Sequence, residues 1–157
     1  MPNLKIASAQ QDLSQLDLIA RECLIQSAGE IVDKQLRLVI DVESYLPSSF
    51  DLSWLKQAML KMLDLAIERS PVRSEIQLTA CRVGDSVELE VADNGDTLNN
   101  DSIAFRPSCS YSFGPIARDL FASVQSRGAE FWGTRCPQGG MAWTLRMPLR
   151  MTMAKAA

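Results

Sequence analysis

Three sites in the sequence, one tripeptide and two single residues, carry residue types that could bind a phosphorylated ligand. Asp93-Asn94-Gly95 places a carboxylate and a glycine directly after an apolar run, and Gly114 stands just before a helical pattern. A glycine there leaves the free N–H groups of a helix N-terminus open to phosphate oxygens. Lys61, within another helical pattern, could pair with such oxygens as a point charge. Each has an ordinary alternative, since Asp, Asn and Gly favour turns and most helix lysines are solvated or pair with nearby acids.

The composition excludes several chemistries. The 157 residues include no histidine, so the chain offers no phosphoacceptor histidine, no Ser–His pair and no imidazole metal ligand. The four cysteines, at positions 23, 81, 109 and 136, form no CxxC pair, which argues against a zinc or redox motif. The net charge is −3 and the basic residues are scattered, so neither nucleic acid nor a membrane surface is an expected partner.

Length and hydropathy indicate one globular domain. Hydrophobic residues make up 46% of the chain and charged residues 22%, a balance that leaves too little polar surplus for disorder. No apolar run approaches the roughly 20 residues that a membrane span needs, and the first residues lack a signal-peptide pattern. We therefore expect a cytoplasmic protein that fills residues 1–157 with a single domain, whose core lies at about 13–149.

Apolar periodicity predicts the elements that position the candidate residues. Helical spacing predicts a helix at about 17–33 with Asp17 as its cap, a second from Asp51 or Ser53 to about Ser70, and a third at about 115–127. Alternation of apolar and polar residues predicts strands over 36–42, 129–135 and 141–147, and a hairpin over 74–93. Residues 94–113 break every period and are expected to form a long loop, and the tail from 150 to 157 is expected to be flexible.

The order of these elements predicts an α/β fold. Hairpins require antiparallel pairing, and three one-sided helices can all lie on one face of the resulting sheet. The expected architecture is a two-layer α/β sandwich, with a mixed, mostly antiparallel sheet covered on one face by three helices.

Several strings, in this order and on these elements, resemble the ATP-binding domain of histidine kinases and the wider Bergerat-fold (GHKL) ATPases. The similarity covers roughly residues 13–149. The matching strings are Leu16-Asp17-Leu18 at the first helix, Phe50 to Ala58 at the second, Asp93-Asn94-Gly95, Ser112 to Ala117, and Pro137-Gln138-Gly139-Gly140 before the last strand. Each string alone is weak, but the set in order is fairly specific.

The resemblance implies a role for each matched residue and also shows departures. In the family the aspartate that Asp93 matches accepts a hydrogen bond from the adenine amino group, and Gly95 matches a glycine that lets the backbone pass close to the base. The family's two asparagines that hold Mg²⁺ and phosphates fall on Lys61 and Leu65, which supply no oxygen ligand. The next glycine of the first motif is replaced by Asp96.

The second glycine motif is also altered. Gly114 is retained, but the glycine expected two residues earlier is Ser112, and Pro115 removes one donor N–H from the helix start. Proline is also an ordinary first residue of a helix, so this change has a purely structural explanation.

Two functional hypotheses follow. The first is a degenerate histidine-kinase-type domain, without catalytic residues or Mg²⁺, that binds a protein partner in a signalling assembly. The second is a nucleotide-binding ATPase or kinase module of a two-component system that retains ATP in modified form, through Asp93, Asn94, Gly95, Gly114 and Lys61. With no histidine in the chain, autophosphorylation would require a partner that supplies it. An exposed apolar patch around Trp54, Trp132 or Phe113 would favour the first hypothesis, although these aromatics could equally be core residues.

Overall fold

The computed structural model describes residues 15–44, 46, 50–95, 114–136 and 139–149 of the chain. The helices in this part are α1 (Gln15–Gln26), α2 (Ala28–Asp33), α3 (Leu52–Arg69) and α4 (Gly114–Ser126). The strands are β1 (Arg37–Val42), β2 (Glu75–Val83), β3 (Ser86–Asp93), β4 (Glu130–Arg135) and β5 (Met141–Pro148). The expectations for Asp96, Ser112, Phe113, the loop at 96–113 and the tail at 150–157 concern residues outside the described part.

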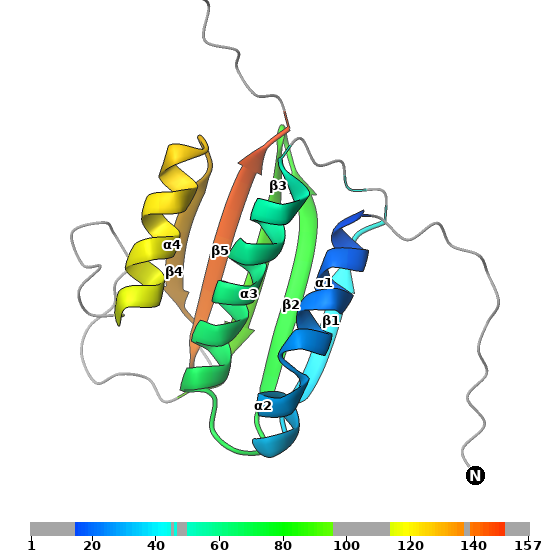
Figure 1. Ribbon diagram of the computed structural model, residues 1–157, viewed down its shortest axis with the longest axis vertical. Coiled ribbons are helices and arrows are strands. Elements are labelled where there is room, and N and C mark those ends of the chain that lie inside the picture. The colour runs from blue at the N-terminus through cyan, green and yellow to red at the C-terminus, as the bar shows by residue number, and fades with distance from the viewer. Residues whose placement is uncertain (1–14, 45, 47–49, 96–113, 137–138, 150–157) are drawn as a thin grey trace, which may run out of the picture.

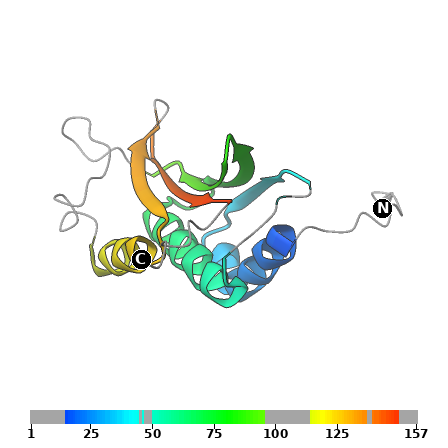
Figure 2. The same ribbon diagram turned by 90° about the horizontal axis from the view of Figure 1, so that it is seen from above.

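The strands form one sheet in the order β1-β2-β3-β5-β4 (Figure 1). β1 runs parallel to β2, whereas β2–β3, β3–β5 and β5–β4 are antiparallel. The helices lie together on one face of this sheet, as the view in Figure 2 shows. The predicted two-layer α/β sandwich with a mixed, mostly antiparallel sheet is therefore confirmed.

The alternating residues of the hairpin explain why the helices cover one face only. Val87, Leu89 and Val91 on β3 are each at most 1% exposed, while the intervening Glu88 and Glu90 are only partly buried. Because successive side chains of a strand point to opposite faces, one face of the sheet is apolar and the other is acidic. The apolar face packs under the helices and forms the core, which includes Leu55, Met59, Met62, Leu63, Leu78, Leu120, Trp143 and Leu145.

The first predicted helix is wrong in one respect, because it is two helices. α1 ends at Gln26 and α2 starts at Ala28, with Ser27 between them in a non-helical conformation (φ −91°, ψ 3°). Serine and glycine are weak helix formers, and Ser27 and Gly29 flank this junction. α1 also starts earlier than expected, so Asp17 lies inside its first turn and pairs with Arg21 instead of capping the helix.

α3 is the central helix and starts as its sequence predicts. The Asp51 carboxylate accepts a hydrogen bond from the Trp54 N–H at 2.9 Å, so Asp51, not Ser53, is the cap. The helix ends at Arg69, where Ser70 turns to extended backbone (φ −71°, ψ 128°), as expected of a residue before proline.

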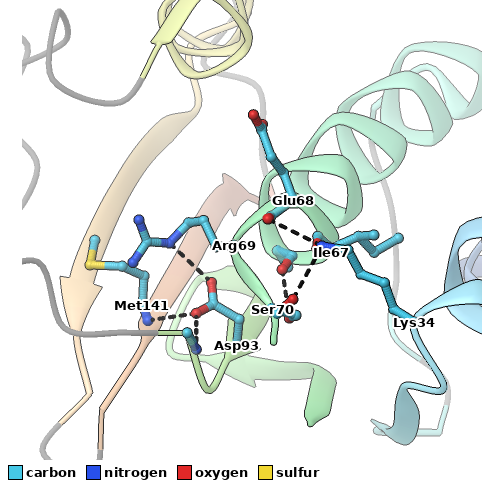
Figure 3. Close-up of polar contacts among 9 residues, drawn as sticks. Lys34, Ile67, Glu68, Arg69, Ser70, Asp93 and Met141 are labelled. Carbon is cyan, nitrogen blue, oxygen red and sulfur yellow. Dashed lines mark hydrogen bonds and ion pairs between the residues drawn. The ribbon is translucent and has the colours of Figure 1, made fainter. Parts of the chain in front are cut away.

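Lys34, which follows α2, caps the other end of α3. Its Nζ donates hydrogen bonds to the carbonyl oxygens of Ile67 at 2.6 Å, Glu68 at 3.2 Å and Ser70 at 3.1 Å (Figure 3). The last carbonyls of a helix lack partners within the helix and carry its negative dipole end, so a cation there is doubly favourable. This contact fixes the C-terminus of α3, and with it Arg69, relative to α2 and β1.

We expect Lys34→Met to lower the free energy of unfolding by about 1–2 kcal/mol, because three carbonyls lose a charged donor. Chemical denaturation monitored by circular dichroism measures the change. Lys61→Met is the matched control, since Lys61 is also partly buried but makes no ion pair with the described residues. The loss of stability in this control should be within about 0.5 kcal/mol. Equal losses in the two variants would contradict the capping role.

Candidate functional site

The predicted Asp93-Asn94-Gly95 segment lies where β3 ends, beside the start of β5 and the C-terminus of α3. Asp93 is the last residue of β3, and Met141 is the first of β5. The contacts described below join both residues to Arg69, the last residue of α3. The sheet order brings these three ends together, because β3 and β5 are neighbours and α3 crosses the same face.

The Asp93 carboxylate is enclosed, and its contacts are internal (Figure 3). Its side chain is 0% exposed, and Oδ1 accepts hydrogen bonds from the backbone N–H groups of Gly95 at 2.9 Å and Met141 at 3.2 Å. Oδ2 lies 3.5 Å from Nε of Arg69, whose own side chain is 19% exposed. That contact is an ion pair without hydrogen-bond geometry, so Oδ2 accepts no hydrogen bond from the described residues.

Opposing effects act on the Asp93 carboxyl. Burial is the largest effect and raises its pKa above the ordinary value of an aspartate. The N–H groups of Gly95 and Met141 and the charge of Arg69 act in the other direction, because each stabilises the ionised form. Arg69 therefore favours the ionised form of this buried carboxyl group.

Two glycines around Asp93 are required by packing. A Cβ on Gly95 would lie 2.7 Å from the carbonyl oxygen of Arg69, and a Cβ on Gly140 would overlap the Asp93 carbonyl oxygen. Gly140 also has a φ of +85°, which favours glycine. The glycine that resembles part of an adenine site therefore has a structural reason to be glycine, namely the close approach of β3 to the end of α3.

Lys61 lies on the side of α3 that borders α4. Trp54, two turns earlier on the same side, donates its Nε1–H to Ser123 of α4 at 2.8 Å. Lys61 is half-buried and Leu65, one turn further, is 3% exposed. Within the described residues Lys61 makes no ion pair, so of the ordinary alternatives for this lysine, pairing with Asp64 or Glu68 is not formed, and Asp96 lies outside the described residues.

The structure does not bring Lys61 to the Asp93 carboxylate. Arg69 is eight residues beyond Lys61 on α3, which is about 12 Å along a helix axis. It is Arg69, which the sequence reasoning missed, that contacts Asp93. A signal was present in the sequence, because Lys61, Leu65 and Arg69 follow one another at intervals of four and so share one side of the helix.

Gly114 starts α4 with a φ of +84° and is partly exposed. Trp54 near the start of α3 contacts Ser123 and Arg127 at the end of α4, so the two helices run in opposite directions. The N-terminus of α4 therefore lies toward the half of α3 that carries Lys61 (Figure 1). Pro115 is exposed and forms an ordinary first turn.

Neither Lys61 nor Leu65 offers an oxygen ligand to a magnesium ion. Mg²⁺ needs oxygen ligands in octahedral geometry, whereas the matched positions on α3 offer an ammonium and a buried isobutyl group. Among the described residues no group of three or more Cys, Asp or Glu side chains is arranged to hold a metal. Asp64 is an acid on the same helix, and partial burial of its carboxyl raises its pKa, as do the nearby carboxylates of Glu30 and Glu68.

Comparison with known proteins identifies the fold. No protein-family model and no curated protein sequence matches the chain. The catalytic domain of the histidine kinase ThkA superposes with a TM-score of 0.69 at 15% identity, over 85% of this chain and 92% of that one. The chain has the fold of a histidine kinase catalytic domain. The Acinetobacter baumannii histidine kinase AdeS gives a TM-score of 0.71 at 14% identity, over 87% of this chain and 66% of that one. A mycobacterial sensor histidine kinase, MprB, gives a TM-score of 0.67 at 16% identity, over 85% of this chain and 93% of that one.

Within this histidine kinase fold, the aromatics considered as a partner surface are half-buried. Trp54 stacks on Phe50 at 5.5 Å between ring centroids, and Arg146 lies over the Trp132 ring at 5.0 Å. Phe113 is outside the described residues. The large apolar side chains that are exposed lie elsewhere, mainly on α1, α2 and β1. None of the described helices is long and apolar enough to cross a membrane.

Proposed function

We propose that this domain does not catalyse Mg·ATP-dependent phosphoryl transfer and acts instead as a protein-interaction module in a cytoplasmic signalling assembly. The observation that carries the proposal is the internal pairing of Asp93. The resemblance to histidine kinases implies an aspartate that accepts a hydrogen bond from adenine, but here Oδ1 is taken by two backbone N–H groups and Oδ2 faces the guanidinium of Arg69. The cation replaces the amino group that a nucleotide would supply.

The α3 side chains support the same proposal. Lys61 and Leu65 match the positions of the family's two asparagines, one of which coordinates Mg²⁺ while the other supports the phosphates, and neither side chain supplies an oxygen ligand. Without the metal, the charge that develops on a transferring phosphoryl group lacks its main counterion. A domain that keeps this fold without these ligands can still function by binding other proteins through its surface.

A second candidate, a domain that binds a nucleotide without Mg²⁺, is favoured by one observation. The buried Oδ2 of Asp93 accepts no hydrogen bond from the described residues, and a buried acceptor of this kind normally has a donor. An adenine amino group could supply one if Arg69 moved aside. Lys61, which makes no ion pair with the described residues, could then meet a phosphate.

Thermal unfolding with ATP or ADP separates the two candidates. We expect millimolar nucleotide, with or without Mg²⁺, to leave the unfolding midpoint unchanged, because the domain does not bind it. Binding would be easy to detect, since a ligand that binds only the native state at a hundred times its Kd adds about 2.7 kcal/mol to the free energy of unfolding. A magnesium-independent rise that is lost in Lys61→Ala and Asp93→Asn would instead establish the second candidate. A rise that needs Mg²⁺, or measurable ATP turnover, would contradict both.

A further inference from the structure

One edge of the sheet is open and self-complementary. β1 is the first strand in the sheet order, and among the described residues it has a partner only on its β2 side. The backbone N–H groups of Arg37 and Glu43 donate to carbonyls of the β2 side at 2.9 Å and 2.8 Å. Since successive residues of a strand direct their backbone groups to opposite sides, Leu38, Ile40 and Val42 direct theirs to the open edge.

This edge lacks the features that usually protect edge strands. Four of the six residues of β1 are apolar, and Ile40 is 41% exposed although Leu38 and Val42, two residues away on either side, pack against the core. Edge strands normally carry proline, a bulge or several charges that prevent pairing with another chain. β1 has only two charged residues, Arg37 and Asp41, and both are exposed.

The spacing of those two charges fits a second copy of the same strand. If two β1 strands pair antiparallel about a two-fold axis at Val39, Arg37 of each copy faces Asp41 of the other, and Leu38 faces Ile40. The backbone agrees with this register, because residues 38 and 40 both present their N–H and C=O groups to the open edge. Two opposite-charge pairs and two apolar pairs form at once.

A neighbouring register, centred on Ile40, would place Arg37 opposite Glu43 of the other copy. It is less favourable, because the Glu43 carboxylate already accepts a hydrogen bond from the Arg82 N–H at 3.0 Å. Within the part of the chain that the structure describes, Asp41 accepts no such bond. The Arg37 side chain is 78% exposed and lies 3.4 Å from the Glu75 carboxylate. The charges that pair in the Val39 register are therefore the available ones.

The opposite edge of the sheet does not have this property. β4 carries Glu130 and Arg135 at its ends. In a two-fold antiparallel pair of identical strands, facing residues must both be odd-numbered or both even-numbered, because only then do their backbone groups meet. Glu130 and Arg135 therefore cannot face each other, and β4 gains no matched charges from a second copy.

We infer that the domain forms a two-fold dimer through β1, in which the two five-stranded sheets join into one continuous sheet. The partner is a second copy of this chain, recognised by strand pairing and by the Arg37–Asp41 exchange. The surface is two strands away from Asp93 in the sheet, so it is independent of whether nucleotide binds.

Sedimentation equilibrium of the full chain tests the dimer with charge-swapped variants. The wild type should associate with a dissociation constant in the micromolar range, as expected of a small interface. Asp41→Arg should raise that constant by about tenfold or more, because both charge pairs become repulsive. The combined Arg37→Asp and Asp41→Arg variant should return to within about threefold of the wild type, since the attraction is restored with the signs exchanged. Circular dichroism of each variant confirms that the fold is retained.

Disulfide trapping tests the register. In an antiparallel pair the non-hydrogen-bonded residues at the axis have Cα atoms about 4.5 Å apart, which suits a disulfide. Val39→Cys should therefore crosslink to itself, whereas Arg37→Cys and Asp41→Cys should crosslink only when the two variants are mixed. These variants are made in a chain whose Cys81, Cys109 and Cys136 are replaced by serine, with buried Cys23 kept.

A chain that stays monomeric up to its solubility limit would overturn the inference. So would a dimer whose dissociation constant is unchanged by Asp41→Arg, or a self-crosslink at residue 37 or 41 but not at 39. Nucleotide binding in the thermal unfolding experiment would contradict the proposed function and leave the dimer untouched.

Discussion

Replacing Asp93 with alanine should lower the free energy of unfolding by about 3–5 kcal/mol, the usual loss when one partner of a buried ion pair is removed. The carboxylate is fully enclosed, and its removal leaves the N–H groups of Gly95 and Met141 without their acceptor and Arg69 without its carboxylate. Asp93→Asn keeps an oxygen for the two N–H groups and should lose less. Equilibrium urea unfolding of the three proteins measures the order. If Asp93→Ala is as stable as the wild type, the carboxylate is not a structural group.

The same pair predicts a pH dependence in Arg69→Met. Burial already raises the pKa of Asp93, and loss of the guanidinium raises it further. A carboxyl whose pKa is raised on folding contributes stability below its unfolded pKa, near about 4, and loses that contribution as the pH rises through the folded pKa. Arg69→Met should therefore be destabilised relative to the wild type by about 3 kcal/mol at neutral pH and by clearly less near pH 4.

The control for this pH dependence is Arg21→Met, which breaks an exposed pair with Asp17. An exposed helix pair of this kind is worth about 0.3–0.5 kcal/mol, and its loss should be small at either pH. A pH-independent loss in Arg69→Met would show that Arg69 stabilises the protein by packing and not by charge.

Gly140→Ala should destabilise the domain by several kcal/mol or prevent folding, on the order of the largest losses seen for single substitutions. The added Cβ would overlap the Asp93 carbonyl oxygen, which belongs to the backbone of β3 and cannot turn away as a side chain could. The positive φ adds a smaller cost.

Gly139→Ala is the matched control for that substitution. Gly139 has a φ of +102°, but among the described residues a Cβ there would meet just the Gly95 carbonyl oxygen, at an ordinary 3.9 Å. It should lose about 1 kcal/mol, from backbone strain alone. Thermal unfolding of both variants measures the difference, and equal losses would show that the close approach of Gly140 to β3 relaxes easily.

These results would also bear on function. If Asp93 and Arg69 mainly hold the end of β3 to the end of α3, the site that resembles an adenine pocket serves as a structural lock. The nucleotide experiment is the complementary test. If ATP binds by separating Arg69 from Asp93, the domain would bind nucleotide at the expense of this stabilising contact.

Most of the architecture follows from local patterns. The period-2 alternation of the hairpin and the one-sided apolar pattern of α3 were sufficient for the predicted sandwich, because burial of an apolar face dictates both. The single helix predicted over 17–33 was wrong, since apolar spacing continues through Ser27 even though the backbone does not. Periodicity reports which face is buried, and it is insensitive to a one-residue break.

The sequence also identified the candidate segments, but their relations depended on the tertiary structure. The strings Asp93-Asn94-Gly95 and Gly139-Gly140 can be read directly from the sequence, and so can the lysine and leucine at positions 61 and 65, where the resemblance implies asparagines. Two contacts form only when distant segments are brought together. Gly140 lies against the Asp93 carbonyl, and Lys34 caps α3 at a carbonyl 33 residues away.

The amino-acid sequence by itself determined the fold class, because the apolar faces of helices and strands follow from residue type and local spacing. It also determined that Lys61 and Leu65 carry no oxygen ligand in their side chains. Only the tertiary structure decided that Arg69, and not Lys61, faces Asp93 and that β1 has an open edge. The physical reason is that charge pairing depends on distances in space of a few ångströms, and the packing of β3, β5 and α3 sets those distances.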